Sequence, residues 1–210
     1  MNNRKLSVGW AQRSITPNGP ILMEGQMYTR VSRYVHDPIT ATALALDNGD
    51  QQAIFVSMDM TEVPLHAMDK IREKLAAWPE IPFEKVSFNV THTHNSTSFY
   101  NDFMRSENVQ GYDEQILPPF QGPENMVWGE KGQNYLVDKL VDLIVSEWEN
   151  RKPGGISYAH DYAAVAFNRR PQFRRENGVE SIMYGNCATE DFVGFEGGID
   201  TAVELLYTWA

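Results

Sequence analysis

The chain of 210 residues is 42% hydrophobic and 11% aromatic, so it is long and apolar enough to form about one domain with a sizeable core. A net charge of -10 argues against nucleic-acid binding, because a phosphate backbone attracts an excess of Lys and Arg. The single cysteine, Cys187, excludes an intrachain disulfide and a zinc site of several thiolates. The sequence has no apolar leader and no apolar run of about 18 residues, which predicts no transmembrane segment, and we expect a cytoplasmic protein.

The N-terminal part of the chain predicts three strands. Residues 6–11 have the composition of a strand, and residues 39–46 and 52–58 are rich in β-branched and small apolar side chains. The segment Asp47-Asn48-Gly49-Asp50 between the last two consists of turn-forming residues. We therefore expect a hairpin with a short loop over residues 39–58.

Helices and strands alternate along the rest of the chain. Apolar residues at helical spacing predict a helix over 65–77, with Thr61 or a neighbour as its cap, and a second helix over 135–148. Further strands are predicted at 86–90, 156–167 and 203–209. This order is typical of an α/β fold, and we expect a layered sandwich with a mixed β-sheet flanked by helices, in one region spanning 1–210.

The connection 97–132 is predicted to be irregular, and compact domains seldom carry so long an irregular segment unless it serves a site. Its aromatic side chains are Phe99, Tyr100, Phe103, Tyr112, Phe120 and Trp128. The segment is therefore a candidate lid or pocket loop. The alternative is that its aromatic side chains only anchor it to the rest of the protein.

Two histidines, His92 and His94, follow the predicted strand 86–90. On an extended backbone alternate side chains point to the same face, so the two imidazoles are expected to converge. Neutral imidazole is a good zinc ligand, and a second imidazole beside it can bind the metal or transfer protons. His-x-His also occurs by chance on exposed strand ends, which leaves a structural interpretation open.

Asp59 and His36 are further candidates for the same site. Asp59 follows an apolar strand, where a carboxylate can orient a metal-binding histidine or can simply cap a strand or helix end. His36 precedes the strand at 39–46, and both a site role and a structural role are open. For His66 and His160 a surface or pairing role is the default expectation.

Several motifs, taken in order, resemble the N-terminal catalytic region of the neutral/alkaline non-lysosomal ceramidases. They are Val8-Gly9-Trp10-Ala11, Ile15-Thr16-Pro17, the segment from His36 to Leu46, Val56-Ser57-Met58-Asp59-Met60, the segment from Asn89 to His94, and Asn168-Arg169-Arg170-Pro171. The resemblance implies zinc-dependent hydrolysis of the amide bond of an N-acyl, lipid-like substrate, which in the family is the sphingolipid ceramide. It also implies that His92 is a zinc ligand, that His94 faces the substrate, and that Arg169 binds substrate or stabilises the oxyanion.

Asn95 and Asn168 adjoin these residues and are candidate substrate contacts by the same resemblance. The chain departs from the family pattern in two places: residues 95–98 replace a Ser-Gly-Pro turn, and Arg170 stands where ceramidases usually have Ser.

The family takes its other zinc ligands, a second His, a Glu and a Tyr, from sequence beyond the strand that residues 203–209 resemble. We therefore expect residues 1–210 to be an incomplete N-terminal portion of a larger catalytic domain that binds zinc weakly or not at all by itself.

Two other functions stay open. One is a non-catalytic domain on the same scaffold that binds a ligand or a partner. The other is an amidohydrolase barrel, which also uses His-x-His but needs about 250 residues for its strand-helix units. The oligomeric state is not predicted by the sequence.

Overall fold

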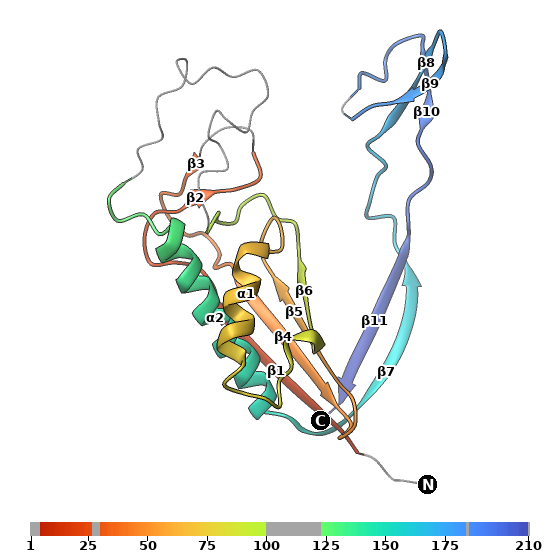
Figure 1. Cartoon of the computed structure of the whole chain (residues 1–210). Helices are drawn as coiled ribbons and strands as arrows, with labels where there is room; N and C mark the ends of the chain where they lie inside the picture. Colours follow the sequence, from red (N-terminus) through yellow and green to blue (C-terminus); the bar gives the residue numbers. More distant parts are fainter. Residues whose placement is uncertain (1–4, 27–29, 100–122, 184, 210) are drawn as a thin grey trace. The chain divides into compact units, whose positions relative to one another are not determined.

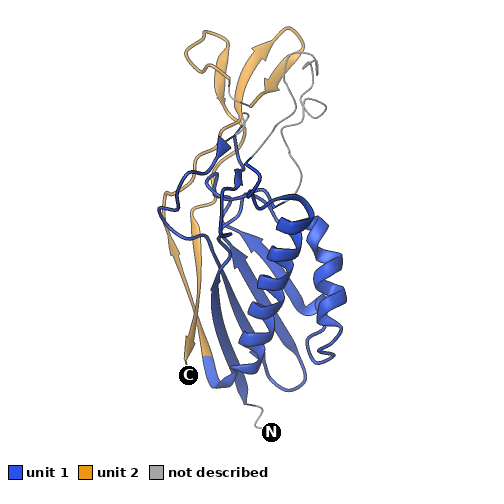
Figure 2. Cartoon of the chain, turned by 90° about the vertical axis from the view of Figure 1, so that its left-hand side faces the viewer, with its two compact units in different colours: residues 1–155, 210 blue, residues 156–209 orange. Residues whose placement is uncertain are grey.

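The computed structural model describes residues 5–26, 30–99, 123–183 and 185–209. These residues form a mixed α/β structure, which confirms the predicted fold class. The chain divides into two compact units, residues 1–155 and residues 156–209 (Figure 2).

The main sheet has six strands in the order β11-β7-β1-β4-β5-β6 (Figure 1). Their bounds are β1 Leu6–Ser14, β4 Thr40–Asp47, β5 Gln52–Met58, β6 Val86–Val90, β7 Lys152–Tyr162 and β11 Ala202–Trp209. β1 pairs with β4 and β7, and β4 with β5, in antiparallel register, whereas β5 and β6 are parallel. The sheet is therefore mixed, as the sequence predicts.

The predicted hairpin is confirmed as β4 and β5. Asp47 lies opposite Gln52, and the turn between them is closed by a hydrogen bond from the Gly49 amide to the Asp47 carboxylate at 2.8 Å. Gly49 has φ +87, a left-handed conformation that glycine adopts without a steric penalty. Turn chemistry and strand composition thus agree on this hairpin.

Two helices, α1 (Leu65–Leu75) and α2 (Gly129–Glu149), lie on one face of the strands β1, β4 and β5 (Figures 1 and 2). Their apolar faces and the inward side chains of the strands form one core. Its largest fully buried members include Ile54, Met58, Ile71, Leu140 and Ile144. This burial supplies the main stabilisation of the first unit.

α1 connects β5 to β6, so the two strands run parallel and both end at the same edge of the sheet. The residues that follow β5 and those that follow β6 are therefore neighbours. This topology brings Thr61 close to His92 although they are 31 positions apart.

Several boundaries differ from the prediction, and the largest shifts are at the start of α2 and at both ends of β7, which spans Lys152–Tyr162 instead of 156–167. α2 begins at Gly129 instead of Tyr135, and Gly132 in its first turns lies so close to the Phe99 carbonyl that a Cβ atom would be 2.8 Å from that oxygen. The low helix propensity of Gly129 and Gly132 argues against a helix here. The close packing of Gly132 against Phe99 nevertheless accommodates one. β7 begins at Lys152, because Gly154 and its neighbours pair with β1.

A small second sheet was not predicted. β2 (Leu22–Met23) and β3 (Arg30–Val31) pair antiparallel, with Met23 opposite Arg30. Met23 also forms a bridge with Thr97, and the Glu24 amide donates to the Ser96 carbonyl at 3.1 Å. Strands of two residues carry too little periodicity to be detected in sequence.

The second unit contains β11, most of β7, and a three-stranded sheet in the order β10-β8-β9. The bounds of these short strands are β8 Pro171–Arg175, β9 Gly178–Ser181 and β10 Phe192–Phe195. No helix in the described ranges is long and apolar enough to span a membrane.

Candidate functional site

His92 and His94 lie in the turn after β6, which ends at Val90. The prediction that an extended strand directs both imidazoles to one face is wrong, because His92 has φ +57. That left-handed conformation is uncommon for a residue other than glycine, and such strain clusters at functional sites. The two side chains converge through this turn and not through strand alternation.

The two imidazoles face each other closely. Their Nε2 atoms are 3.4 Å apart, and their ring centroids are 5.1 Å apart at an interplanar angle of 76°. The Nδ1 atom of His92 is 2.5 Å from the Thr61 carbonyl oxygen. Because a carbonyl can only accept, Nδ1 of His92 carries the proton, and Nε2 presents its lone pair when the ring is neutral.

These atoms fit one part of a zinc site. Nε2 of His92 is the ring nitrogen without the Thr61 contact and can bind a metal, and Nε2 of His94 lies 3.4 Å from it, close enough to act on a group bound there. A backbone carbonyl on the other ring nitrogen is the usual support of a metal-binding histidine. Across the described parts of the chain, however, no three His, Cys, Asp or Glu side chains form a group that can hold a metal ion.

Thr61 supports this turn in a second way, since its hydroxyl donates to the Thr93 carbonyl at 2.9 Å. The sequence predicts Thr61 or a neighbour as the cap of α1, but Thr61 does not cap this helix. The helix begins after Pro64 without a side-chain cap. Thr61 therefore links the segment after β5 to the histidine turn.

Glu24 is a polar neighbour of the pair that the sequence did not reveal. The pKa of Glu24 is raised to about 7, because the effects of burial and of the Glu62 carboxylate outweigh the opposing effects of a Thr61 hydrogen bond and of His92. Glu24 comes from the segment after β2, and no spacing in the sequence relates it to His92.

Asp59 accepts hydrogen bonds from the Thr40 amide and the Thr40 hydroxyl, both at 2.9 Å. The Thr91 hydroxyl is 3.5 Å from its other oxygen. These contacts fit the strand-end alternative, and the proposed role of Asp59 behind a metal-binding histidine stays a prediction.

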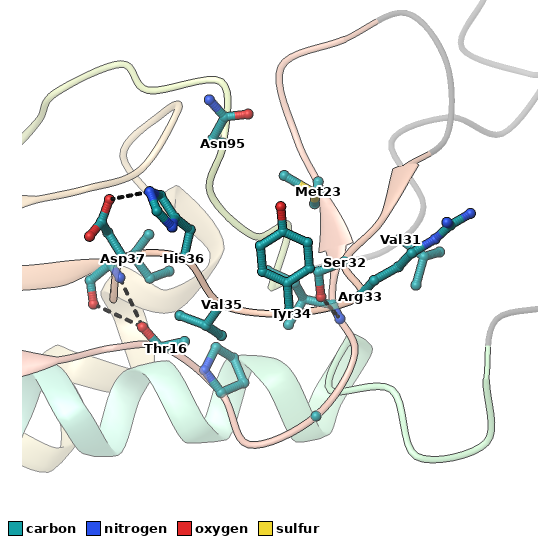
Figure 3. A pocket seen from close by; sticks show the side chains of 14 residues that line it. Thr16, Met23, Val31, Ser32, Arg33, Tyr34, Val35, His36, Asp37 and Asn95 are labelled. Carbon is teal, nitrogen blue, oxygen red and sulfur yellow. Dashed lines mark hydrogen bonds and ion pairs between the residues drawn. The ribbon is translucent and has the colours of Figure 1, made fainter.

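The structure brings His36 and Asn95 to the walls of one cavity of about 480 Å³ (Figure 3). His36 lies 3.8 Å from the Asp37 carboxylate, and both side chains are exposed. Tyr34 and Met23 line the cavity as well, so its wall combines polar and apolar groups. Because Asn95 directly follows His94, the cavity adjoins the histidine turn.

Asn168 and Arg169 lie in the second unit, between β7 and β8. The Asn168 amide donates to the carbonyls of Glu196 and Gly197, and its oxygen accepts from the Arg170 amide at 2.9 Å. Asn168 thus braces its own loop. That Asn168 and Arg169 meet the histidine pair stays a prediction, as does the lid role of 97–132, of which residues 100–122 lie outside the described residues.

This chain is similar in structure to two solved ceramidases. No protein-family model matches it, and no match was found among curated proteins. Among solved structures, a ceramidase complexed with C2 is similar, with a TM-score of 0.61 and 20% identity over 80% of this chain and 25% of that chain. A neutral ceramidase from Pseudomonas aeruginosa is similar with a TM-score of 0.60 and 18% identity over 82% of this chain and 25% of that chain.

The chain thus spans about a quarter of the length of these two structures. At such low identity the similarity is evidence of a shared fold only, and the chemistry has to be argued from the residues of the site. About four fifths of this chain thus shares a fold with part of these two ceramidase structures.

Proposed function

We propose that the chain forms part of a zinc-dependent, ceramidase-like hydrolase that cleaves the amide bond of an N-acyl, lipid-like substrate. The observation that carries this proposal is the histidine pair, with Nε2 atoms 3.4 Å apart and Nδ1 of His92 donating to the Thr61 carbonyl. The fold likeness to ceramidases supports it.

Each residue of the proposed site has a distinct task. His92 holds the metal through Nε2, because its other nitrogen is occupied by Thr61. His94 faces the substrate and exchanges a proton with it. Asn95 and Asn168 bind polar groups of the substrate, and Arg169 stabilises the developing oxyanion. When bound, zinc polarises a carbonyl and lowers the pKa of water to about 7, which is the chemistry that amide hydrolysis needs.

The test is hydrolysis of a fluorogenic N-acyl sphingosine analogue by the full gene product. We expect His92→Ala to abolish turnover and Arg169→Ala to reduce kcat on the order of 10²- to 10³-fold, as loss of one oxyanion donor does. His66→Ala, on the exposed first turn of α1, is the matched control and should leave kcat unchanged. Removal of metal by a chelator should stop the reaction, and added Zn²⁺ should restore it.

The cavity lined by His36 and Asn95 favours a second candidate, a domain that binds a ligand without converting it. Wild-type turnover in the His92→Ala variant would refute the zinc mechanism. Saturable binding of the N-acyl analogue without any turnover would favour the second candidate.

A further inference from the structure

The Arg30 side chain connects two segments that are far apart in sequence. Its Nη2 donates to the His94 carbonyl at 2.5 Å and to the Glu24 carbonyl at 2.7 Å, and its Nη1 is 3.3 Å from the side-chain oxygen of Asn95. None of these three acceptors is a carboxylate. Within the described parts of the chain, Arg30 therefore acts as a hydrogen-bonding brace and not as a member of an ion pair.

The small sheet places Arg30 for this task. β2 lies between β3 and the segment after the histidine turn, since Met23 pairs with Arg30 and also bridges to Thr97. From β3 the long Arg30 side chain reaches the carbonyl of His94, 64 positions away. His94 itself lies beyond the end of β6, so the ladder of the main sheet does not fix its backbone.

Gly25, which follows β2 in the chain, packs against the side chain of His94. A Cβ atom built on Gly25 would lie 2.5 Å from Cγ, 2.6 Å from Cβ and 2.8 Å from Cα of His94. The glycine also has φ +96, a conformation that other residues rarely adopt. The backbone of His94 is thus held by Arg30, and the base of its imidazole packs against Gly25.

We propose that Arg30 is a positioning residue for His94. It fixes the peptide of His94 and the amide of Asn95, and so directs Nε2 of His94 toward Nε2 of His92. The planar guanidinium matches this task, because one rigid group serves several acceptors at once, which the single ammonium of a lysine cannot do with the same geometry. The consequence for catalysis rests on the proposed hydrolase function, whereas the positioning itself does not.

The positioning is tested by nuclear magnetic resonance on the 210-residue chain. We expect a nuclear Overhauser effect between the imidazole protons of His92 and His94, whose ring centroids are 5.1 Å apart. Arg30→Ala should abolish it and Arg30→Lys should weaken it. Arg72→Ala is the matched control, because Arg72 pairs with Asp69 on α1, and it should leave the effect intact.

Activity of the full gene product gives the second readout. Arg30→Ala should lower kcat about 10- to 100-fold with KM within about twofold, the range typical of residues that orient an active-site histidine. In a His94→Ala background the same substitution should cause no further loss, because Arg30 acts through His94. Should Arg30→Ala unfold the small sheet, as judged by the melting temperature, Arg30→Lys takes its place in both measurements.

Two results would overturn the proposal: an unchanged Overhauser effect in Arg30→Ala, or an equal loss of kcat with and without His94. A wild-type protein without amidase activity would instead refute the proposed function. In that case the Overhauser effect alone still decides the role of Arg30, so the two failures are distinguishable.

Discussion

The two compact units differ in how their strands are held. In residues 1–155 the helices α1 and α2 cover the inward face of the strands, and a continuous apolar core results. Among the described residues 156–209, only Pro171 and Phe173 are buried. The first unit is thus stabilised by apolar burial, and the second by backbone pairing and surface ion pairs.

The second unit exposes many large apolar side chains instead. They are Ile156, Tyr158, Tyr162, Val165, Phe167, Val179, Met183, Val193, Phe195, Ile199, Leu206, Tyr207 and Trp209. Its ion pairs, such as Arg170 with Glu196, are exposed to solvent and contribute little stability individually. The histidine turn therefore belongs to a unit with a well-packed core, whereas Arg169, its predicted partner, belongs to a unit in which few described residues are buried.

The largest expected effect tests this contrast directly. Leu140 is fully buried in α2, so Leu140→Ala should lower the free energy of unfolding by about 2–5 kcal/mol. Leu206 in β11 is 45% exposed, so Leu206→Ala should change it by less than about 0.5 kcal/mol. Urea denaturation followed by circular dichroism measures both. A loss above about 2 kcal/mol for Leu206→Ala would mean that the second unit has a core after all.

A buried carboxyl group should make the first unit sensitive to pH. Both carboxyl oxygens of Glu147 are buried and have no hydrogen-bond partner among the described residues. Burial outweighs the opposing charge of Arg151, so the pKa of Glu147 is raised to about 9. Since the folded-state pKa of Glu147 is above its ordinary value of 4.5, the stabilising contribution of this group is complete below pH 4.5 and is lost as pH rises toward 9.

We therefore expect wild type to lose about 1–3 kcal/mol more stability than Glu147→Gln between pH 5 and pH 8. The control in the second unit is Glu196→Gln, where hydrogen bonding by Arg170 lowers the pKa of the carboxyl. The contribution of Glu196 to stability has the opposite dependence on pH. It is present above the pKa of Glu196 in the unfolded chain and is lost as pH falls through its pKa in the folded protein. Parallel pH profiles for wild type and Glu147→Gln would contradict the prediction.

Each unit contains a glycine with positive φ at which an alanine substitution tests the backbone: Gly25 in the first unit and Gly178 in the second. Gly25→Ala combines an unfavourable φ of +96 with overlap of His94, and should cost about 1–3 kcal/mol. Gly178→Ala, at the first position of β9, has φ +129 and no atom within 4 Å, so only conformational strain is expected. Hydrogen exchange should show opening confined to β8 and β9 for Gly178→Ala. If Gly178→Ala instead destabilises the whole protein, the expectation that its effect stays within β8 and β9 is wrong.

The smallest effect concerns the strain at His92 itself. Because φ is +57 there, His92→Gly should be more stable than His92→Ala by about 1 kcal/mol, while both variants lose the imidazole. Thermal unfolding of the two variants measures the difference. If alanine is tolerated as well as glycine, the turn relaxes without the histidine and its strain is not imposed by the scaffold.

Local sequence patterns were enough to predict several helices and strands. The hairpin β4–β5, the helix over Leu65–Leu75 and the strand Val86–Val90 follow from turn residues and from the periodicity of apolar side chains. These signals lie within a few positions of one another, so they survive without knowledge of the fold. The pairing of His92 with His94 was likewise visible, because the two residues are neighbours in sequence.

The contacts that position the histidine pair, in contrast, arise from long-range folding. The left-handed turn at His92, the Thr61 carbonyl on its Nδ1 and the Arg30 brace on His94 depend on segments that meet only after folding. A parallel crossover through α1 brings the ends of β5 and β6 together, and a two-residue strand carries Arg30 across β2. Such contacts join residues 31 and 64 positions apart, a distance at which no local pattern of side chains can encode them.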